Sequence, residues 1–215
     1  MSHIVRQPAW GDIDLDTETG RIFVQERWSY TWTVVPPARA WTLEQRRRFH
    51  NIADRQIWGT WSGHVRLQVA GNHAFVDRFR HGLPAVSFDA RWVLSNGHWE
   101  VTVRKMPRGS DPTTFISYVD FPARQIQLDS ADVASYLPSN AAGQQRTFYA
   151  LSHEFGHTMP QSPGIPNQDE YTAGSPHLGD TESILNIGRQ VRAPCRRTWQ
   201  VTPLLSSIRS PLRRA

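Results

Sequence analysis

The chain has 215 residues, of which 39% are hydrophobic and 20% are charged. This composition is typical of a globular protein and excludes a disordered or collagen-like chain. The single cysteine, Cys195, excludes an internal disulfide and a cysteine-based zinc cluster. No apolar run approaches the roughly 18 residues of a membrane-spanning helix, so we predict no membrane span. The length favours a single domain, which we place at residues 1–190.

The net charge of +5 is unevenly distributed. No acidic residue follows Glu182, whereas seven arginines do. Residues 1–182 carry the other 17 basic side chains and all 19 acidic ones, a net charge of −2. The basic excess therefore belongs to the C-terminal end, and we predict that residues 191–215 form a poorly ordered basic tail. Such a tail could act as a nucleic-acid-binding arm, but we favour a solvated end and expect no nucleic-acid partner.

Residues 1–130 are predicted to be mainly β-strands. β-Branched and aromatic residues favour strands at 21–28 and 30–35. Thr42 followed by Gln45 forms a capping box, and apolar residues at helical spacing predict a helix from there through Ile57. Further strands are predicted at 64–70, 86–94, 114–119 and 125–128. Asn96-Gly97 supplies a left-handed turn between 90–94 and 98–104, which predicts a β-hairpin.

A second helix is predicted from about residue 140 to 159, because Phe148, Leu151 and Phe155 fall on one side of it. Pro160 ends this helix. The fold class is therefore α+β, with a twisted, mixed or mainly antiparallel sheet packed on helices. Most of the nine tryptophans lie in the strand-rich half. They fit core and cross-strand packing better than a stripe that binds sugars or peptides.

The strongest functional signal is His153-Glu154-Phe155-Gly156-His157 on the second helix. Residues four apart lie on one face of a helix, so both imidazoles can bind one metal ion. Zn²⁺ suits such nitrogen ligands. Glu154 is rotated by about 100° from His153, so it reaches the water at the metal rather than the metal itself. We predict that His153 and His157 bind Zn²⁺ and that Glu154 is the general base.

A catalytic zinc site needs a third protein ligand and one open position. The candidates are acidic or imidazole side chains downstream of the helix: Asp169, Glu170, His177, Asp180 and Glu182. Spacing alone does not select among them.

Residues 145–190 resemble the zincin metallopeptidases, and within these the metzincins more than the thermolysin-like enzymes. Ser183-Ile184-Leu185-Asn186 looks like the metzincin Ser-Ile-Met-Asn turn under the metal, with Leu185 in place of methionine. Asp169-Glu170-Tyr171 resembles the Asp-Glu-Tyr that follows H-E-F-G-H in several bacterial metallopeptidase families, where an acidic residue replaces the third histidine. Two features depart from the pattern: Pro160 replaces an expected glycine, and a longer interval precedes Asp169.

The resemblance implies a zincin-like fold and a zinc-dependent peptidase that acts on a peptide or protein. It favours Asp169 as the third ligand, followed by Glu170, whereas Glu182 would fit a thermolysin-like arrangement. Tyr171 is a candidate donor to the oxyanion, although packing under the loop is the more ordinary role for such a residue. We expect an extended peptide to bind between the helix and an edge strand, for which 114–119 and 124–128 are the candidates.

The H-E-F-G-H, D-E-Y and S-I-L-N-x-G segments also resemble metallopeptidase toxin domains of bacterial type VI secretion spike and Rhs-type effectors. This resemblance implies an antibacterial toxin and an immunity protein in the producing cell. Residues 1–6 lack the apolar stretch of a secretory signal. We therefore expect either effector-type delivery without a signal peptide or a cytoplasmic location in the producer.

The main alternative is a non-catalytic binding module whose metal is structural. The tryptophan-rich half would then be the working surface. A structural zinc has four protein ligands, whereas a catalytic zinc keeps one position open for water or substrate.

Overall fold

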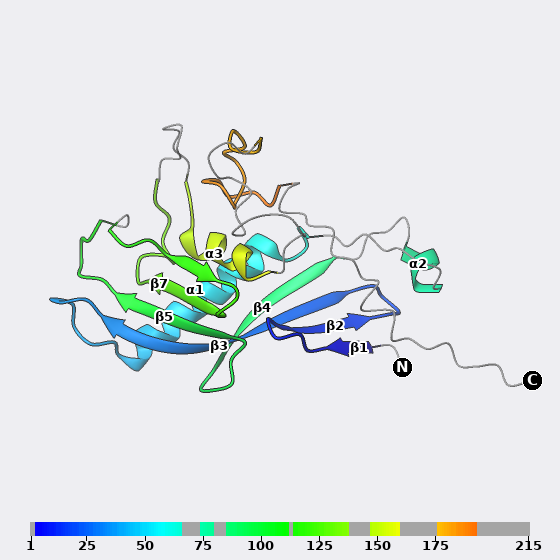
Figure 1. Ribbon diagram of the computed structural model, residues 1–215, viewed down its shortest axis with the longest axis horizontal. Coiled ribbons are helices and arrows are strands. Elements are labelled where there is room, and N and C mark those ends of the chain that lie inside the picture. The colour runs from blue at the N-terminus through cyan, green and yellow to red at the C-terminus, as the bar shows by residue number, and fades with distance from the viewer. Residues whose placement is uncertain are drawn as a thin grey trace, which may run out of the picture.

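The computed structural model of the chain describes residues 3–65, 74–79, 85–111, 114–137, 147–159 and 176–192. It has the predicted α+β class, with an open seven-stranded sheet packed against a few helices (Figure 1). In chain order the elements are β1 (His3–Arg6), β2 (Asp12–Asp16), β3 (Ile22–Val34), α1 (Leu43–Trp61), α2 (Ala74–Phe79), β4 (Val86–Val93), β5 (Trp99–Lys105), β6 (Tyr118–Asp120), β7 (Gln125–Asp129) and α3 (Ala150–Thr158). Most of the predicted strand at 64–70, and the tail from residue 193, lie outside the described residues.

The sheet is mixed. Its strand order is β1-β2-β3-β5-β7-β6, with β4 paired to β3 off this path. The pairs β1–β2, β2–β3 and β6–β7 are antiparallel, whereas β3–β4, β3–β5 and β5–β7 are parallel. Of the two predicted alternatives, the mixed sheet is confirmed and the mainly antiparallel sheet is wrong. One cause is α1, which returns the chain from the end of β3 to the start of β4, as parallel neighbours require.

The predicted hairpin at Asn96-Gly97 is also wrong. Trp28 and Ser29 of β3 each pair with a residue of β4 and a residue of β5. β4 and β5 therefore lie on opposite edges of β3. The loop at 94–98 therefore crosses β3 instead of turning back along β4. Asn96 has the left-handed φ of 56° that suits such a turn. Gly97 donates its N–H to the Ser29 hydroxyl (2.9 Å), and a side chain at Gly97 would collide with Ser29.

α1 begins where the capping box predicts. The Thr42 hydroxyl accepts from the Gln45 N–H, and the Gln45 side chain accepts from the Thr42 N–H, both at 3.2 Å. Phe49, Ala53 and Ile57 are buried along one side of the helix. α1 contacts β4 and α3, so it links the sheet to the helix that carries the histidines.

α3 begins later than predicted. Phe148 forms an isolated antiparallel bridge with Tyr136, with N···O distances of 2.9 and 3.1 Å. This pairing uses the N–H and the carbonyl of Phe148, so the helix starts at Ala150. The Leu151 N–H donates to the Asp132 carbonyl (3.3 Å), which satisfies one of the free N–H groups of the first turn.

One face of the sheet forms the core with α1 and α3. Residues alternate between buried and more exposed along β3, β4 and β5. The ring of Phe155 in α3 lies 6.5 Å from Trp28 and 5.7 Å from Phe88, measured between centroids. On its other side it lies 6.2 Å from Trp61 of α1. Trp28, Trp61 and Trp99 are fully buried, which supports packing roles for these three tryptophans.

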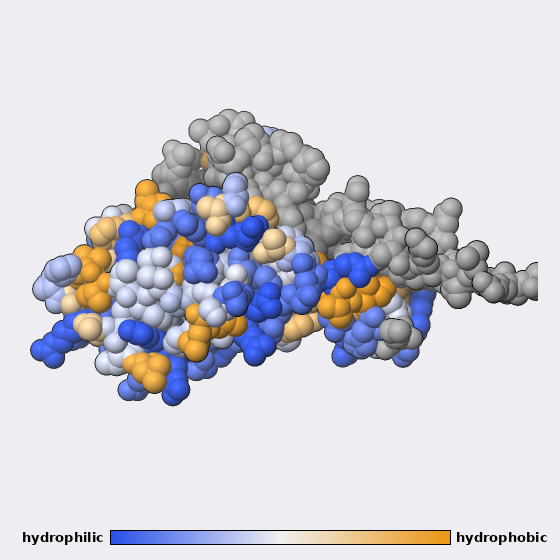
Figure 2. All heavy atoms as spheres, turned by 60° about the horizontal axis from the view of Figure 1, so that its bottom comes forward, coloured by the Kyte–Doolittle hydropathy of each residue, from blue (hydrophilic) through white to orange (hydrophobic). Residues whose placement is uncertain are grey.

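The face of the molecule in Figure 2 is mainly hydrophilic, and its hydrophobic residues form separate groups. Large exposed hydrophobic residues come from different parts of the chain, such as Val5, Leu94 and Ile116. Scattered residues of this kind are normal on a protein surface. The face therefore does not present one large apolar interface.

A carboxyl group is buried between β3 and the end of α3. Glu26 Oε2 accepts from the Trp28 indole N–H (2.9 Å), and Glu26 Oε1 lies 2.6 Å from the Thr158 hydroxyl. That hydroxyl is also 2.7 Å from the Phe155 carbonyl oxygen. Its one proton cannot serve both oxygens, so both contacts are satisfied when Glu26 is protonated. Burial raises the pKa of Glu26 to about 8, which keeps it neutral at lower pH.

We expect Glu26 to make the protein less stable as the pH rises. Its pKa is higher in the folded chain than the ordinary value of 4.5, so the folded state binds more protons between about pH 4.5 and 8. The free energy of unfolding should fall there by up to about 1.4 kcal/mol per pH unit. Glu26→Gln preserves the contacts without ionising, so urea unfolding at several pH values should show its stability rising relative to the wild type as the pH increases. The exposed Glu100→Gln control should show the same pH dependence of stability as the wild type. If the unfolding free energies of Glu26→Gln and the wild type change with pH in parallel, this account is contradicted.

Candidate functional site

Two imidazoles of α3 face each other. His153 and His157 lie one helical turn apart, and their Nε2 atoms are 3.1 Å from each other. Their ring centroids are 4.8 Å apart. The structure therefore brings together the two side chains that the motif spacing pairs.

A backbone carbonyl fixes the orientation of the first ring. His153 Nδ1 lies 2.8 Å from the carbonyl oxygen of Ile184. A carbonyl oxygen only accepts hydrogen bonds, so Nδ1 of His153 carries the proton and donates it. In the neutral ring, Nε2 then has a lone pair, and this atom faces His157. An outer hydrogen bond of this kind is typical of metal-binding histidines, because it sets the tautomer and the ring orientation.

The spacing of the two nitrogens fits Zn²⁺. Two Zn–N bonds of about 2.0–2.1 Å at a tetrahedral angle place the nitrogens about 3.3 Å apart. The 3.1 Å between the Nε2 atoms of His153 and His157 is close to this value. The pair can therefore supply two zinc ligands with little movement of either ring.

The Ile184 carbonyl belongs to a compact turn at residues 183–188. The Ser183 carbonyl accepts from the Asn186 N–H (3.1 Å) and the Gly188 N–H (2.8 Å). The Asn186 side chain donates to the carbonyls of Leu178 (2.9 Å) and Asp180 (3.2 Å). This is the segment that resembles the metzincin turn, and these bonds hold its backbone in place beside His153.

Close packing joins the same turn to α3. A Cβ atom at Gly156 would collide with the side chain of Leu185 and would lie 2.8 Å from the Trp61 ring. Gly156 therefore allows the turn and α1 to approach the helix within the H-E-F-G-H motif. The residue at position 185 contributes apolar packing to this contact.

Glu154 lines a pocket of 310 Å³ next to His153. Its side chain is largely buried, with 7% of the residue exposed. The pocket combines the segment before β6, the segment after β7, α3 and the turn. Its lining residues are Phe115, Ile116, Ser117, Asp132, Tyr136, Phe148, Ala150, His153, Glu154 and Ile187.

Two polar residues of this pocket, Tyr136 and Asp132, belong to no sequence motif that we recognised. Burial, together with the negative charges of Asp132 and Glu154, raises the pKa of Tyr136 to about 12, so its hydroxyl stays protonated. Burial and the charge of Asp129 raise the pKa of Asp132 to about 7. The spacing of Asp129 and Asp132 is typical of a turn closed by an aspartate side chain, but it does not indicate that Asp132 lines a pocket with Glu154.

The described residues do not show a third ligand for a metal ion held by His153 and His157. Within the described parts of the chain, no three His, Cys, Asp or Glu side chains lie close enough to hold a metal ion. Glu182 directly precedes the turn, and its carbonyl accepts from the N–H groups of Arg189 and Gln190. It does not form such a group with the two histidines. Asp169, Glu170 and Tyr171 lie outside the described residues, so their roles stay predictions.

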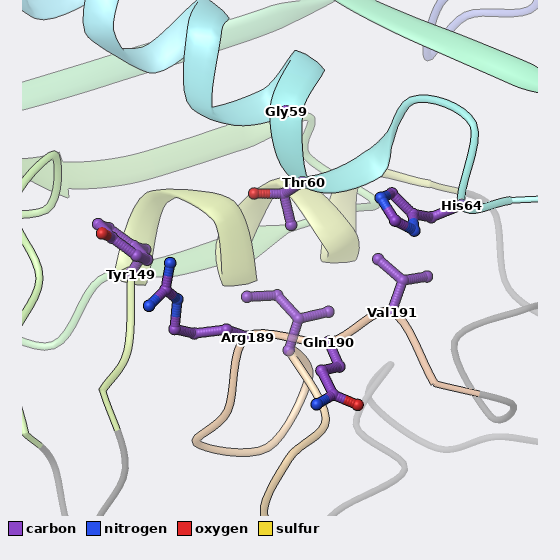
Figure 3. A pocket seen from close by; sticks show the side chains of 8 residues that line it. Gly59, Thr60, His64, Tyr149, Arg189, Gln190 and Val191 are labelled. Atoms are coloured by element: carbon purple, nitrogen blue, oxygen red, sulfur yellow. The ribbon is translucent and has the colours of Figure 1, made fainter.

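A second hollow, of 410 Å³, lies on another side of the turn (Figure 3). Thr60 and His64 line it from the end of α1 and the residues that follow. The Arg189 guanidinium lies over the ring of Tyr149, 5.1 Å from its centroid. Neither His153 nor Glu154 lines this hollow, so it is separate from the candidate metal site.

No protein-family model, curated protein or solved structure matches this chain. Within the described residues, no helix has the length and apolar character needed to cross a membrane. The case for a function therefore rests on the geometry of the site and on the sequence motif.

We expect Gly156→Ala to destabilise the protein. The added methyl group would overlap Leu185 and approach Trp61, and overpacking of this kind costs about 1–3 kcal/mol. Gly59→Ala is the matched control, because Gly59 is also helical but has no atom within 4 Å of a new Cβ. It should be neutral or stabilising by up to about 1 kcal/mol. Thermal and urea unfolding measure both effects, and equal stability of the two variants would refute the close packing at Gly156.

Proposed function

We propose that the chain is a zinc-dependent metallopeptidase. The observation that carries this proposal is the pair of facing Nε2 atoms, 3.1 Å apart, with the His153 tautomer set by the Ile184 carbonyl. The nearby pocket, which contains Glu154, supports a catalytic rather than a purely structural site.

The residues of the site have separate roles in the proposed hydrolysis. Zn²⁺, when bound, would supply Lewis-acid chemistry toward water and a peptide carbonyl. Glu154 would accept the proton of the attacking water and deliver it to the leaving amine. The burial of Glu154 supports this role because it limits competition from bulk water. Tyr171 is the proposed donor to the oxyanion, and Asp169 is the proposed third ligand.

A peptide substrate has a suitable strand to pair with. β6 is the last strand of the sheet order, is antiparallel to β7 and contacts α3. Of the two predicted edge segments, 114–119 leads into this edge strand, whereas β7 lies inside the sheet between β5 and β6. Ile116 and Tyr118 are 82% and 49% exposed. We propose that an extended peptide adds to β6 and reaches the pocket at Glu154.

Metal content and hydrolysis can be measured separately on purified protein. We expect the wild type and Glu154→Ala to hold about one zinc per chain. Glu154→Ala should lose about 10²- to 10⁴-fold of peptide hydrolysis, because it removes the general base. His153→Ala should lose both zinc and hydrolysis, and the His64→Ala control should keep both.

Several outcomes would overturn parts of this proposal. Zinc-dependent cleavage retained by Glu154→Ala would remove the proposed role of Glu154. Stoichiometric zinc without any hydrolysis by the wild type would favour the binding module with a structural metal. Among Asp169→Ala, Glu170→Ala and Glu182→Ala, we expect the first to lose zinc, and zinc loss in another variant would reassign the third ligand.

We further infer that the enzyme is a secreted antibacterial effector toxin with a cognate immunity protein. The support is the sequence resemblance of the H-E-F-G-H, D-E-Y and S-I-L-N-x-G segments to effector toxin domains. Expression of wild type and Glu154→Ala in a bacterial host, in the cytoplasm and in the periplasm, tests this inference. Growth arrest by the wild type alone in either compartment would support it, and equal growth in both would contradict it.

A further inference from the structure

We propose that the pocket beside Glu154 is a subsite for a positively charged group of the substrate, with Asp132 as its anionic anchor. This inference rests on the proposed peptidase function in one respect: that function makes the bound cation part of a substrate. The pocket, its charge and its aromatic lining are features of the described residues themselves.

Asp132 has one carboxylate oxygen available for a ligand. Its Oδ2 accepts from the Ser117 hydroxyl (2.6 Å) and from the Asp129 N–H (2.7 Å). No group of the described residues donates to Oδ1 of Asp132. The residue is only 4% exposed, yet it lines the pocket. A carboxylate in such a buried residue loses much of its hydration, and a bound ammonium or guanidinium group would compensate for that loss.

The described residues do not already neutralise this carboxylate by direct pairing. Among them, no basic side chain forms an ion pair with Asp132. Arg104 lies nearby, but its guanidinium stacks over the Phe115 ring at 4.3 Å from the centroid. Its charge lowers the pKa of Asp132 less than burial and Asp129 raise it. Burial raises the pKa of Asp132 to about 7, and a bound substrate cation would stabilise the charged form of this carboxylate.

The walls of the pocket also suit a cation. Tyr136 and Phe148 line it beside Phe115, whose ring already carries the Arg104 guanidinium on one face. The rings of Tyr136 and Phe148 stand nearly perpendicular, 5.5 Å apart. Aromatic faces attract ammonium and guanidinium groups. A volume of 310 Å³ is at the low end of the usual range of about 300–1,000 Å³ for small-ligand pockets. It therefore suits one side chain or a chain terminus rather than a larger ligand.

The position of the pocket connects recognition to the reaction. His153 and Glu154 line the same pocket as Asp132, so a cation held there would lie close to the peptide bond being cleaved. Two sources have this chemistry: a lysine or arginine side chain, and the free amino terminus of a peptide. Both are consistent with the pocket, so the experiment must distinguish them.

Three small probes, added to the full chain in the presence of zinc, test the preference by calorimetric or NMR titration. Nα-acetyl-lysine methylamide carries a side-chain cation, norleucine methylamide carries a free α-amine, and Nα-acetyl-norleucine methylamide carries neither. We expect at least one cationic probe to bind about tenfold more tightly than the neutral probe. The tighter of the two cationic probes identifies the source. Equal affinities for all three would overturn the proposal without requiring any variant.

Asp132→Asn tests the anchor. The asparagine carbonyl can still accept from Ser117 and the Asp129 N–H, so the change mainly removes the charge. The cation preference should disappear in this variant. The control is Asp120→Asn, the same change on an exposed acid of β6, and it should leave the preference intact. A preference that survives Asp132→Asn would contradict the role of Asp132.

The binding test is independent of catalysis. A chain that prefers the cationic probes but cleaves no peptide would refute the peptidase proposal and retain the subsite. A chain that cleaves peptides but shows no cation preference would refute the subsite and retain the peptidase proposal.

Discussion

The candidate site depends on the hydrogen bond between His153 Nδ1 and the carbonyl oxygen of Ile184. This bond determines which ring nitrogen carries the proton, and so it leaves the Nε2 lone pair facing His157. It also joins two segments about thirty residues apart in the chain, because Ile184 lies in the turn that packs on α3. Leu185 of the same turn lies against Gly156. Tautomer, ring orientation and helix packing are therefore set by one local contact region.

α3 can hold this geometry because its other sides are fixed in the core. Phe155 packs between the sheet and α1, and Thr158 contacts the buried carboxyl of Glu26. The Asp132 carbonyl accepts from the first turn of the helix. A site on a short helix with both ends anchored is positioned more precisely than one on a loop. The same anchoring places Asp132 in the pocket of Glu154.

The sequence predicted the features that depend on local geometry. The capping box at Thr42 and the pairing of His153 with His157 follow from helical spacing, and both appear in the structure. Errors arose where distant strands decide the outcome. The Asn96-Gly97 turn crosses β3 because β4 pairs with one edge of β3 and β5 with the other, and a sequence signal for a turn does not identify the strand that follows. The late start of α3 has a similar cause, since Phe148 pairs with Tyr136.

The lining of the pocket was also beyond prediction from local sequence patterns. Asp132 and Tyr136 precede the motif by many residues and meet Glu154 only through the fold. No spacing rule links them to the histidines. The sequence did not select one candidate for a third ligand of the proposed metal site either, because several acidic residues follow the helix at comparable distances along the chain.

The most direct test of the account is ¹⁵N NMR of the histidine rings during zinc titration. The account predicts that Nδ1 of His153 is protonated before and after zinc is added, because it donates to Ile184. It also predicts that zinc shifts the Nε2 resonances of His153 and His157 together, at about one equivalent. A proton on Nε2 of His153 in the neutral ring, or Nε2 resonances of both rings that do not respond to zinc, would contradict the central claim.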